Sequence, residues 1–266
     1  MLIGLVLLII SGGAIGTWFC ARNALSDAIR IAGGPKGGEY YKFGEAVKER
    51  LQSGKGRRVQ NIQTGGTLEN LALLQQGKVD FAFLQSIVFP SRNISVVAPL
   101  YLEPVIIPAR KESGIESVYD LANKRVCTGS GQSGTGKTAD TLLEFYGLKV
   151  EKVPAFFTVD HDDCDAGIIV MGLRSPSLKK IGTTGAVRFL DLPYTQALTE
   201  SEAYTAEFSI PEAMFARDPS LPGQTLHTFA YTALLAVNSD KASAEYINEV
   251  LEIIYQTDIR TKFPDL

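Results

Sequence analysis

Residues 58–76 read RVQNIQTGGTLENLALLQQ, and this stretch decides the fold class. Its first six residues follow the alternating pattern of a β-strand. The turn residues TGGT come next, and the apolar-rich segment 68–76 then predicts a helix that ends before Gly77. A strand that passes through a glycine turn directly into a helix is the repeating unit of α/β folds, so we expect an α/β protein.

The same alternation of strands and helices extends on both sides of this stretch. Strands that alternate with helices predict parallel sheets, with ligand sites at the carboxyl ends of the strands. Pro104 and Pro108 favour an edge or crossover position for their strand. We expect the other strands at 29–32, 79–84, 103–110, 124–128, 166–171, 187–190 and 228–237, and the other helices at 40–53, 117–123, 137–146 and 242–255.

The composition excludes several classes of protein. Hydrophobic residues make up 45% of the 266 residues and charged residues 21%, which fits a globular protein with a full core. Lys and Arg (26) nearly balance Asp and Glu (29), so no nucleic-acid partner is expected. The three cysteines are too few for a disulfide scaffold, and whether Cys127 pairs with Cys164 stays open because the sequence does not give their separation.

The first residues form a separate segment. Residues 2–20 carry no charge and are mostly apolar. This segment has about the length of roughly 20 residues that a bilayer-spanning helix needs. Trp18 and Phe19 are typical of anchors at a membrane surface. We therefore predict a membrane anchor or signal segment at 1–22. Either one places the rest of the chain in the periplasm or elsewhere outside the cytoplasm, anchored to the cytoplasmic membrane if the segment is retained.

Residues 131–138, GQSGTGKT, match the phosphate-binding pattern G-x-x-x-x-G-K-[ST] in full. Two features argue against a nucleotide site. A complete strand–helix unit precedes the pattern, and the best candidate for a magnesium-binding strand, 187–191, carries Arg188 in its middle. A P-loop nucleotide-binding protein that uses Gly131 to Thr138 remains as an alternative.

An ordered series of motifs resembles TAXI-type solute receptors, the extracytoplasmic binding proteins of TRAP (tripartite ATP-independent periplasmic) transporters. One departure is Ile87, which stands where that family often has an aspartate. The similar segments are IRIAGG at 29–34 with GGEYY at 37–41, QTGGTLEN at 63–70, GKVDFAFLQS at 77–86, KRV at 124–126 with SGT at 133–135, DAG at 165–167, IP at 210–211, PGQ at 222–224 and ALLAV at 233–237.

The resemblance implies a two-lobed fold of the type II periplasmic binding protein kind. Lobe 1 would comprise residues 28–109 and 224–266, and lobe 2 residues 110–223. Such a receptor captures a small carboxylate or amino acid, such as glutamate, and hands it to a TRAP-type membrane permease. It is not an enzyme, so no catalytic residue, cofactor or metal is expected. A membrane-anchored sensory protein that keeps the receptor fold is a further alternative.

The two glycine loops at 64–67 and 133–135 give this expectation a physical basis. Each lies between a strand and the start of a helix, where free backbone N–H groups and the helix dipole attract an anion. Ordinary turns remain an alternative for both loops, and core packing remains one for Tyr40. The resemblance implies ligand binding by Gly38, Tyr40, Thr64, Gly66, Thr67, Gln85, Ser86, Ser133, Gly134 and Thr135.

Overall fold

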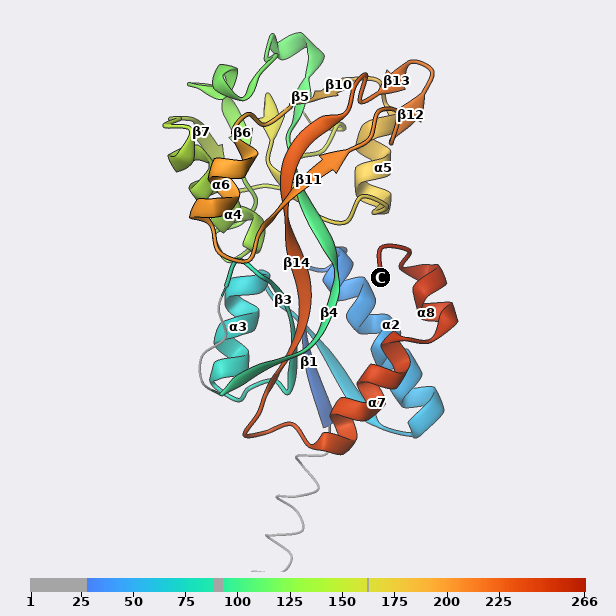
Figure 1. Ribbon diagram of the computed structural model, residues 1–266. Helices are drawn as coiled ribbons and strands as arrows, with labels where there is room; N and C mark the ends of the chain where they lie inside the picture. Colours follow the sequence, from blue (N-terminus) through green and yellow to red (C-terminus); the bar gives the residue numbers. More distant parts are fainter. Residues whose placement is uncertain (1–27, 89–92, 162) are drawn as a thin grey trace, which may run out of the picture.

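A computed structural model of the chain describes residues 28–88, 93–161 and 163–266. The predicted segment at 1–22 lies outside these residues. The described chain forms two lobes, one above the other in Figure 1, and the long strands β4 and β14 pass from one lobe into the other. Within the described ranges, no helix has the length and apolar character needed to cross a bilayer.

The first lobe is built on most of a seven-stranded sheet in the order β2-β1-β3-β14-β4-β9, with β11 also paired to β14. Strands β9 and β11 pair with the ends of β4 and β14 that reach the second lobe. Helix α2 packs on β1 and β2, and α7 packs against α2. Between α2 and the sheet lies a core that includes Phe43, Phe81 and Phe83. The elements are β1 (Ala28–Gly34), α2 (Glu39–Lys55), β2 (Arg58–Gln63), α3 (Thr67–Gln75), β3 (Phe81–Gln85), β4 (Ile94–Ile106), β14 (Leu226–Asn238), α7 (Ala244–Ile254) and α8 (Thr257–Lys262).

The second lobe is built on a five-stranded sheet in the order β10-β5-β8-β6-β7. Its core lies between this sheet and α4 and includes Val126, Ala139 and Leu142. The elements are β5 (Pro108–Arg110), the 3-10 helices η1 (Lys111–Ser113) and η2 (Val118–Leu121), β6 (Arg125–Cys127), α4 (Gly134–Phe145), β7 (Glu151–Val153), β8 (Ala166–Gly167), β9 (Ile169–Val170), α5 (Pro176–Thr183), β10 (Val187–Phe189), α6 (Thr195–Ser201), β11 (Ala206–Ile210), β12 (Ala216–Arg217) and β13 (Ser220–Leu221).

The expectation of parallel sheets is confirmed only for part of each sheet. Strand β1 runs parallel to β2 and β3, but β14 lies antiparallel to both β3 and β4. The reason is that the chain returns from the second lobe through β14, so this strand enters the first sheet from the opposite end. Both sheets are therefore mixed, since β5 also runs antiparallel to β10 and β8.

Two predicted strands also differ from the structure. The strand expected at 166–171 is split into β8 and β9 because Ala166 pairs with Ala109 in one sheet while Ile169 pairs with Ile106 in the other. The strand expected at 103–110 begins nine residues earlier, at Ile94, and is interrupted before β5. Both differences arise because these segments pass between the lobes, a tertiary constraint that local sequence patterns do not record.

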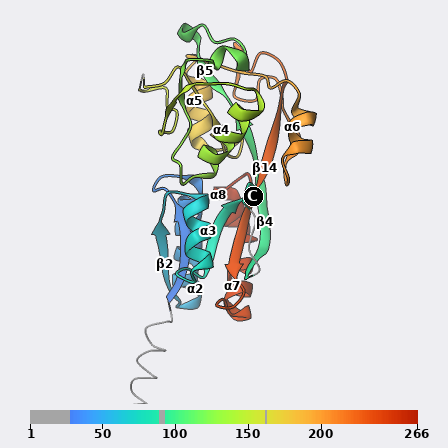
Figure 2. The same cartoon turned by 90° about the vertical axis from the view of Figure 1, so that its left-hand side faces the viewer.

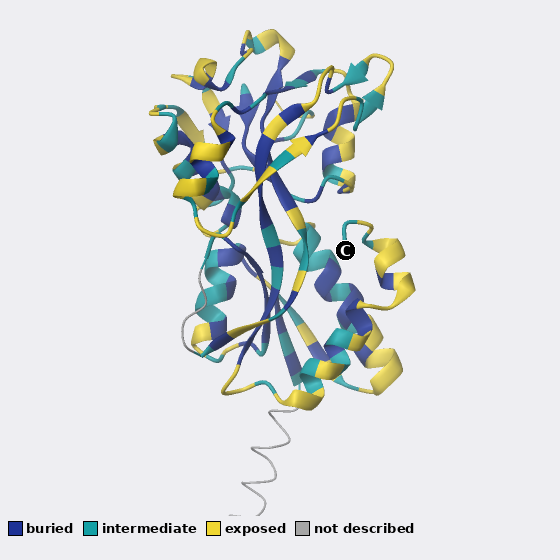
Figure 3. Cartoon of the chain, viewed as in Figure 1, coloured by how far each residue is buried: buried dark blue, intermediate teal, exposed yellow. Residues whose placement is uncertain are grey.

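The crossover is a paired ribbon of two strands. Strands β4 and β14 pair from Pro104 with Ala230 at one end to Ile94 with Asn238 at the other. Figure 2 shows both strands running past the gap between the lobes, and Figure 3 shows mostly buried residues along β14 through this region. The site described below lies beside this ribbon.

The two lobes touch each other directly. The backbone N–H of Leu68, in the first lobe, donates to Gln132 O in the second, with an N–O distance of 3.1 Å. The hydroxyl of Ser130 donates to Gly65 O at 3.2 Å. These contacts join the two glycine loops, so the described structure has the lobes in a closed arrangement.

Candidate functional site

A cavity of about 550 Å³ lies between the lobes. The first turns of α2, α3 and α4 all reach its wall, and Ser177 brings the start of α5 to the same space. Of the residues predicted to bind ligand, Gly38, Tyr40, Gly66, Thr67, Gln85, Ser133, Gly134 and Thr135 line this cavity.

Gly66 and Thr67 form the wall at the start of α3. Gly66 has φ of +123°, a conformation that side chains with a Cβ rarely adopt, and a Cβ there would lie 3.0 Å from the Ser133 Cα atom. Glycine is therefore required both by the backbone and by the close approach of the other lobe. The hydroxyl of Thr67 accepts a hydrogen bond from Gln85 N at 3.2 Å, which ties the helix to the end of β3.

The start of α4 forms the facing wall. Ser133 caps this helix: its hydroxyl accepts from Gly136 N at 3.0 Å and donates to Ser130 O at 2.7 Å. The N–H groups of Gly134 and Thr135, in the first turn, have no acceptor within the helix. Because the helix dipole adds positive potential at this end, the wall favours a carboxylate or another small anion.

A buried carboxyl group that the sequence reasoning missed lies at the floor of the cavity. Glu103, on β4, is 4% exposed, and its Oε2 accepts from the Tyr40 hydroxyl at 2.7 Å and from Gln85 Nε2 at 3.1 Å. Burial raises the pKa of Glu103 to about 7, although the two hydrogen bonds lower it. A glutamate inside the otherwise apolar run LEPVII at 102–107 was the available signal.

Tyr40 and Gln85 act together at this floor. Tyr40 contacts the ring of Phe83 at 5.7 Å between centroids, so its ring packs on the core while its hydroxyl holds Glu103. Gln85 is 3% exposed and sits at the carboxyl end of β3. The two residues were predicted as direct ligand contacts, which stays a prediction, and in the structure both donate to the buried carboxylate.

The second lobe adds apolar side chains to the lining. Phe156, which is 44% exposed, lies in the wall together with Met171 and Val170. The charged residues of the lining are Lys36, Glu39 and Glu103. No arginine of the described residues lines the cavity.

Thr64 and Ser86 do not line the cavity. The Thr64 hydroxyl bonds Asn70 and accepts from Gly66 N, so it shapes the loop from within. Ser86 donates to Tyr204 O and accepts from Thr232 N, both at 2.9 Å, and thereby fastens the end of β3 to the crossover. Both residues hold neighbouring backbone rather than face the open space.

The sequence matches the model of the NMT1-like family over residues 31–259, which is most of the chain. The chain belongs to the NMT1-like family. The predicted two-lobed fold of type II periplasmic binding proteins is confirmed, whereas membership of the TAXI group stays a prediction.

Solved structures with the same fold are distant in sequence from this NMT1-like protein. Tv2483 bound to L-arginine is 13% identical, with a TM-score of 0.54 over 92% of this chain and 90% of that one. The GluR0 ligand-binding core from Nostoc punctiforme with L-glutamate is 14% identical, with a TM-score of 0.52 over 90% and 97%. The effector-binding domain of QuiR with shikimate is 15% identical, with a TM-score of 0.51 over 85% and 94%. At these identities the likeness establishes the fold alone.

In this NMT1-like protein, the residues that match the phosphate-binding pattern do not have the surroundings of a P-loop. In a P-loop the hydroxyl of the final Ser or Thr binds Mg²⁺. Here Thr138 is fully buried, and its hydroxyl donates to Gly134 O at 3.0 Å and to Gln85 Oε1 at 3.4 Å. Lys137 is exposed and does not line the cavity. The geometry of these two residues argues against a nucleotide site.

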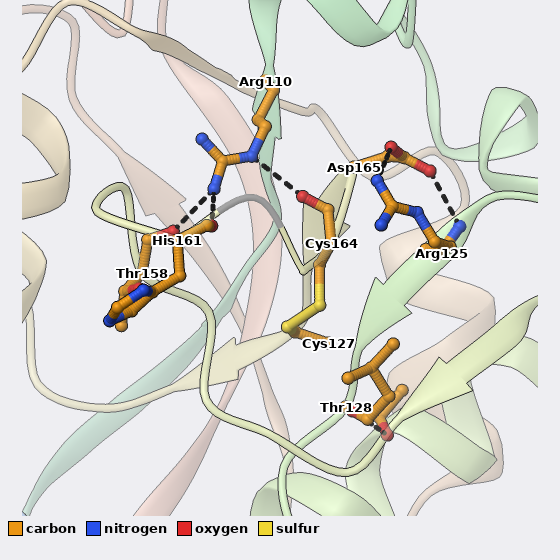
Figure 4. The surroundings of a disulfide bond; sticks show 9 residues. Arg110, Arg125, Cys127, Thr128, Thr158, His161, Cys164 and Asp165 are labelled. Atoms are coloured by element: carbon orange, nitrogen blue, oxygen red, sulfur yellow. Dashed lines mark hydrogen bonds and ion pairs between the residues drawn. A yellow bond between two sulfur atoms is a disulfide. The ribbon is translucent and has the colours of Figure 1, made fainter.

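The second lobe contains a disulfide between Cys127 and Cys164, whose Cα atoms lie 5.6 Å apart. Figure 4 shows it beside Arg110, which is 6% exposed and donates to the carbonyl oxygens of Cys164, Thr158 and His161. The pairing that the sequence left open is therefore present. It fastens the segment before β8 to the end of β6.

Proposed function

We propose that this protein is an extracytoplasmic receptor that captures a small carboxylate or amino acid between its lobes and delivers it to a TRAP-type permease. The observation that carries the proposal is the meeting of the first turns of α2, α3 and α4 at one cavity between the lobes. The free first-turn N–H groups of α4 can bind a carboxylate without any covalent step.

The related structures support this choice of ligand class. By their names, they hold L-arginine, L-glutamate or shikimate, each of which carries a carboxylate. The contacts between the two glycine loops add support, because closure of one lobe on the other buries a ligand held between them.

Ligand binding by the full chain tests the receptor proposal. The expected result is a thermal shift with a small carboxylate or amino acid, since a ligand at 100 times its dissociation constant adds about 2.7 kcal/mol of stability. L-glutamate, L-leucine, succinate and Mg²⁺-ATP form the panel. A shift with Mg²⁺-ATP alone would contradict the proposal and restore the P-loop alternative.

A matched pair of glycine variants locates the binding site. A Cβ at Gly134 would lie 2.4 Å from Gln85 Oε1, so Gly134→Ala displaces the Gln85 side chain in the cavity wall and should weaken binding at least tenfold. Gly131 has no atom within 4 Å of its hypothetical Cβ, so Gly131→Ala should bind as the wild type does. Gly131 is also the first glycine of the phosphate-binding pattern, and a nucleotide site would respond in the opposite way.

The Cys127–Cys164 disulfide supports a location outside the cytoplasm, because disulfides persist in oxidising compartments. Trapping free thiols with an alkylating agent in intact cells, followed by mass spectrometry, checks this. The expected result is an unmodified, disulfide-bonded pair. Alkylation of both cysteines in the intact cells would contradict the proposed location.

Delivery to a permease rests on the resemblance to TAXI receptors alone and needs its own test. Cells that express the full chain together with a TRAP-type permease should take up the bound solute, while cells with either protein alone should not. Recovery of the solute unchanged after incubation with the purified chain would support a receptor without enzymatic activity. Ligand binding without any permease-dependent uptake would favour a sensory role.

A further inference from the structure

We propose that the ligand carries an ammonium group bound by Glu103 in addition to a carboxylate bound at the start of α4. The ligand is then an α-amino acid rather than a simple carboxylate or dicarboxylate. This inference rests on the proposed function and deepens it by naming the ligand class of the same cavity.

The hydrogen bonds of Glu103 leave one carboxyl oxygen for a ligand. Both bonds to this side chain, from Tyr40 and Gln85, end on Oε2. Oε1 accepts no hydrogen bond from the described residues, and Glu103 lines the cavity. A buried carboxylate with an unused oxygen is costly unless a donor or cation reaches it. A ligand ammonium group supplies both the donor and the charge.

The proposed carboxylate and ammonium positions both adjoin the side chain of Gln85. Gln85 connects them: its Nε2 donates to Glu103, and its Oε1 lies 2.4 Å from where a Cβ of Gly134 would be. The first-turn N–H groups of α4 and the Glu103 carboxyl group are thus separated by a single side chain. In an α-amino acid the carboxylate and the ammonium group are attached to the same carbon, which matches this short separation.

The charges of the lining also favour a zwitterion over a dianion. Two acids, Glu39 and Glu103, and one base, Lys36, line the described cavity. Glu39 is already paired with Lys42 at 2.8 Å, so a dicarboxylate would place its second negative charge beside Glu103, with only Lys36 of the described lining to offset it. An α-amino acid adds no net charge through its backbone groups, and its ammonium group offsets Glu103.

The ionisation of Glu103 couples the ligand to protons. The groups near Glu103 are Tyr40 from α2, Gln85 from β3, Tyr101 on β4 itself and Asp265 from the C-terminal segment, with Glu39 and Lys36 at the cavity wall. Burial keeps part of the Glu103 population protonated near neutral pH. An ammonium group binds the ionised form of Glu103. Ligand binding therefore releases a proton from those molecules in which Glu103 was protonated.

Calorimetric titration of the full chain with two matched pairs tests the inference. The pairs are L-glutamate with glutarate and L-leucine with 4-methylpentanoate, which differ within each pair only by the ammonium group. In each pair that binds, the amino acid should bind at least tenfold more tightly than its partner. In Glu103→Gln the ratio of the two dissociation constants within a pair should fall to within about twofold of one. The control Glu112→Gln, at an exposed position away from the cavity, should keep the wild-type ratio.

The possible outcomes separate this inference from the proposed function. If glutarate or 4-methylpentanoate binds as tightly as its amino acid, the receptor function stands and the role of Glu103 is overturned. The same holds if folded Glu103→Gln keeps the wild-type ratio. If neither the four compounds nor the other panel members bind, both proposals fail. The affinities of the paired compounds for the wild-type chain can be compared without any variant. The test therefore stands even if Glu103→Gln does not fold.

Discussion

Glu103 and Arg110 are two buried charged residues on consecutive strands, β4 and β5, and their surroundings differ. They are 4% and 6% exposed. The Arg110 guanidinium donates to the carbonyl oxygens of Cys164, Thr158 and His161 and lies 5.4 Å from the centroid of the Phe157 ring (Figure 4). The Glu103 carboxylate has protein donors on one oxygen and faces the cavity with the other.

This difference separates a structural charge from a binding charge. A buried charged group costs free energy unless hydrogen bonds and opposite charge offset the loss of water. Arg110 receives that compensation from the backbone of the segment that precedes β8, so its role is to hold that segment. Glu103 receives part of it and has a free position for a ligand. Burial alone does not identify a functional charge, but an unused polar atom at a cavity does.

The largest effect is expected from removal of the structural charge. Arg110→Met leaves several buried carbonyl oxygens without a donor and should lower the free energy of unfolding by roughly 3–5 kcal/mol. Urea denaturation of the variant and the wild type, with the disulfide intact in both, measures this. A loss of less than about 1 kcal/mol would mean that water replaces the guanidinium. Arg110 would then not be the structural charge that the comparison with Glu103 takes it to be.

Removal of the Glu103 charge should raise the free energy of unfolding, whereas removal of the Arg110 charge should lower it. The pKa of Glu103 is about 7 in the folded protein and 4.5 in a free side chain. The native state therefore binds the proton more tightly, and stability falls as the pH rises from 4.5 to 7. Glu103→Gln removes this penalty and should stabilise the protein by up to about 3 kcal/mol at pH 8, with a smaller gain at pH 5.

Urea denaturation at pH 5 and pH 8 checks this prediction. Equal effects of Glu103→Gln at the two pH values would show that the carboxyl group titrates normally. Destabilisation of the variant at pH 8 would show that Glu103, like Arg110, has a structural role. The contrast between the two residues would then disappear.

The affinity for an amino acid should depend on pH through Glu103. With a pKa of about 7, the ionised fraction of Glu103 rises about tenfold from pH 6 to pH 8. The dissociation constant for L-leucine or L-glutamate should fall by a similar factor over this range. Calorimetry at the two pH values measures it. The same titration with Glu103→Gln should give a nearly constant value, and a steep dependence there would assign the effect to another group.

The smallest effect is expected from an exposed charge of the second lobe. Arg125 pairs with Asp165 at 3.1 Å, and its side chain is 45% exposed. Arg125→Gln should change the free energy of unfolding by less than about 1 kcal/mol because water screens such pairs. This variant sharpens the comparison with Arg110→Met, since both remove a guanidinium from the same lobe. Similar losses in the two variants would show that burial is not what sets the effect of Arg110.

The sequence predicted the parts of the fold and site that depend on local patterns. The strand–turn–helix units place Gly66 and Gly134 at helix starts, and the structure brings both to one cavity. The mixed sheet could not be predicted this way, because the antiparallel position of β14 follows from the return of the chain through the second lobe.

Glu103 was missed for a related reason. It follows no turn or glycine loop, and its role depends on Tyr40 and Gln85, which come from other elements. The disulfide shows the same limit, since the separation of Cys127 and Cys164 is set by the pairing of β6 with β8. Ligand binding by the cavity residues stays a prediction until it is measured.

The crossover ribbon has a mechanical consequence for movement of the two lobes. The register of β14 on β4 shifts between Thr232 and Leu234, an irregularity that increases local twist and compliance. Tyr231, next to this shift, pairs with Glu103, and Ala233, within it, pairs with Gln85. If the lobes swing about this point, Glu103 and Gln85 lie near the axis and move little, whereas Phe156 and the start of α4 move with the second lobe. The floor of the cavity is then set in place before a ligand arrives, and closure of the second lobe brings the start of α4 to it.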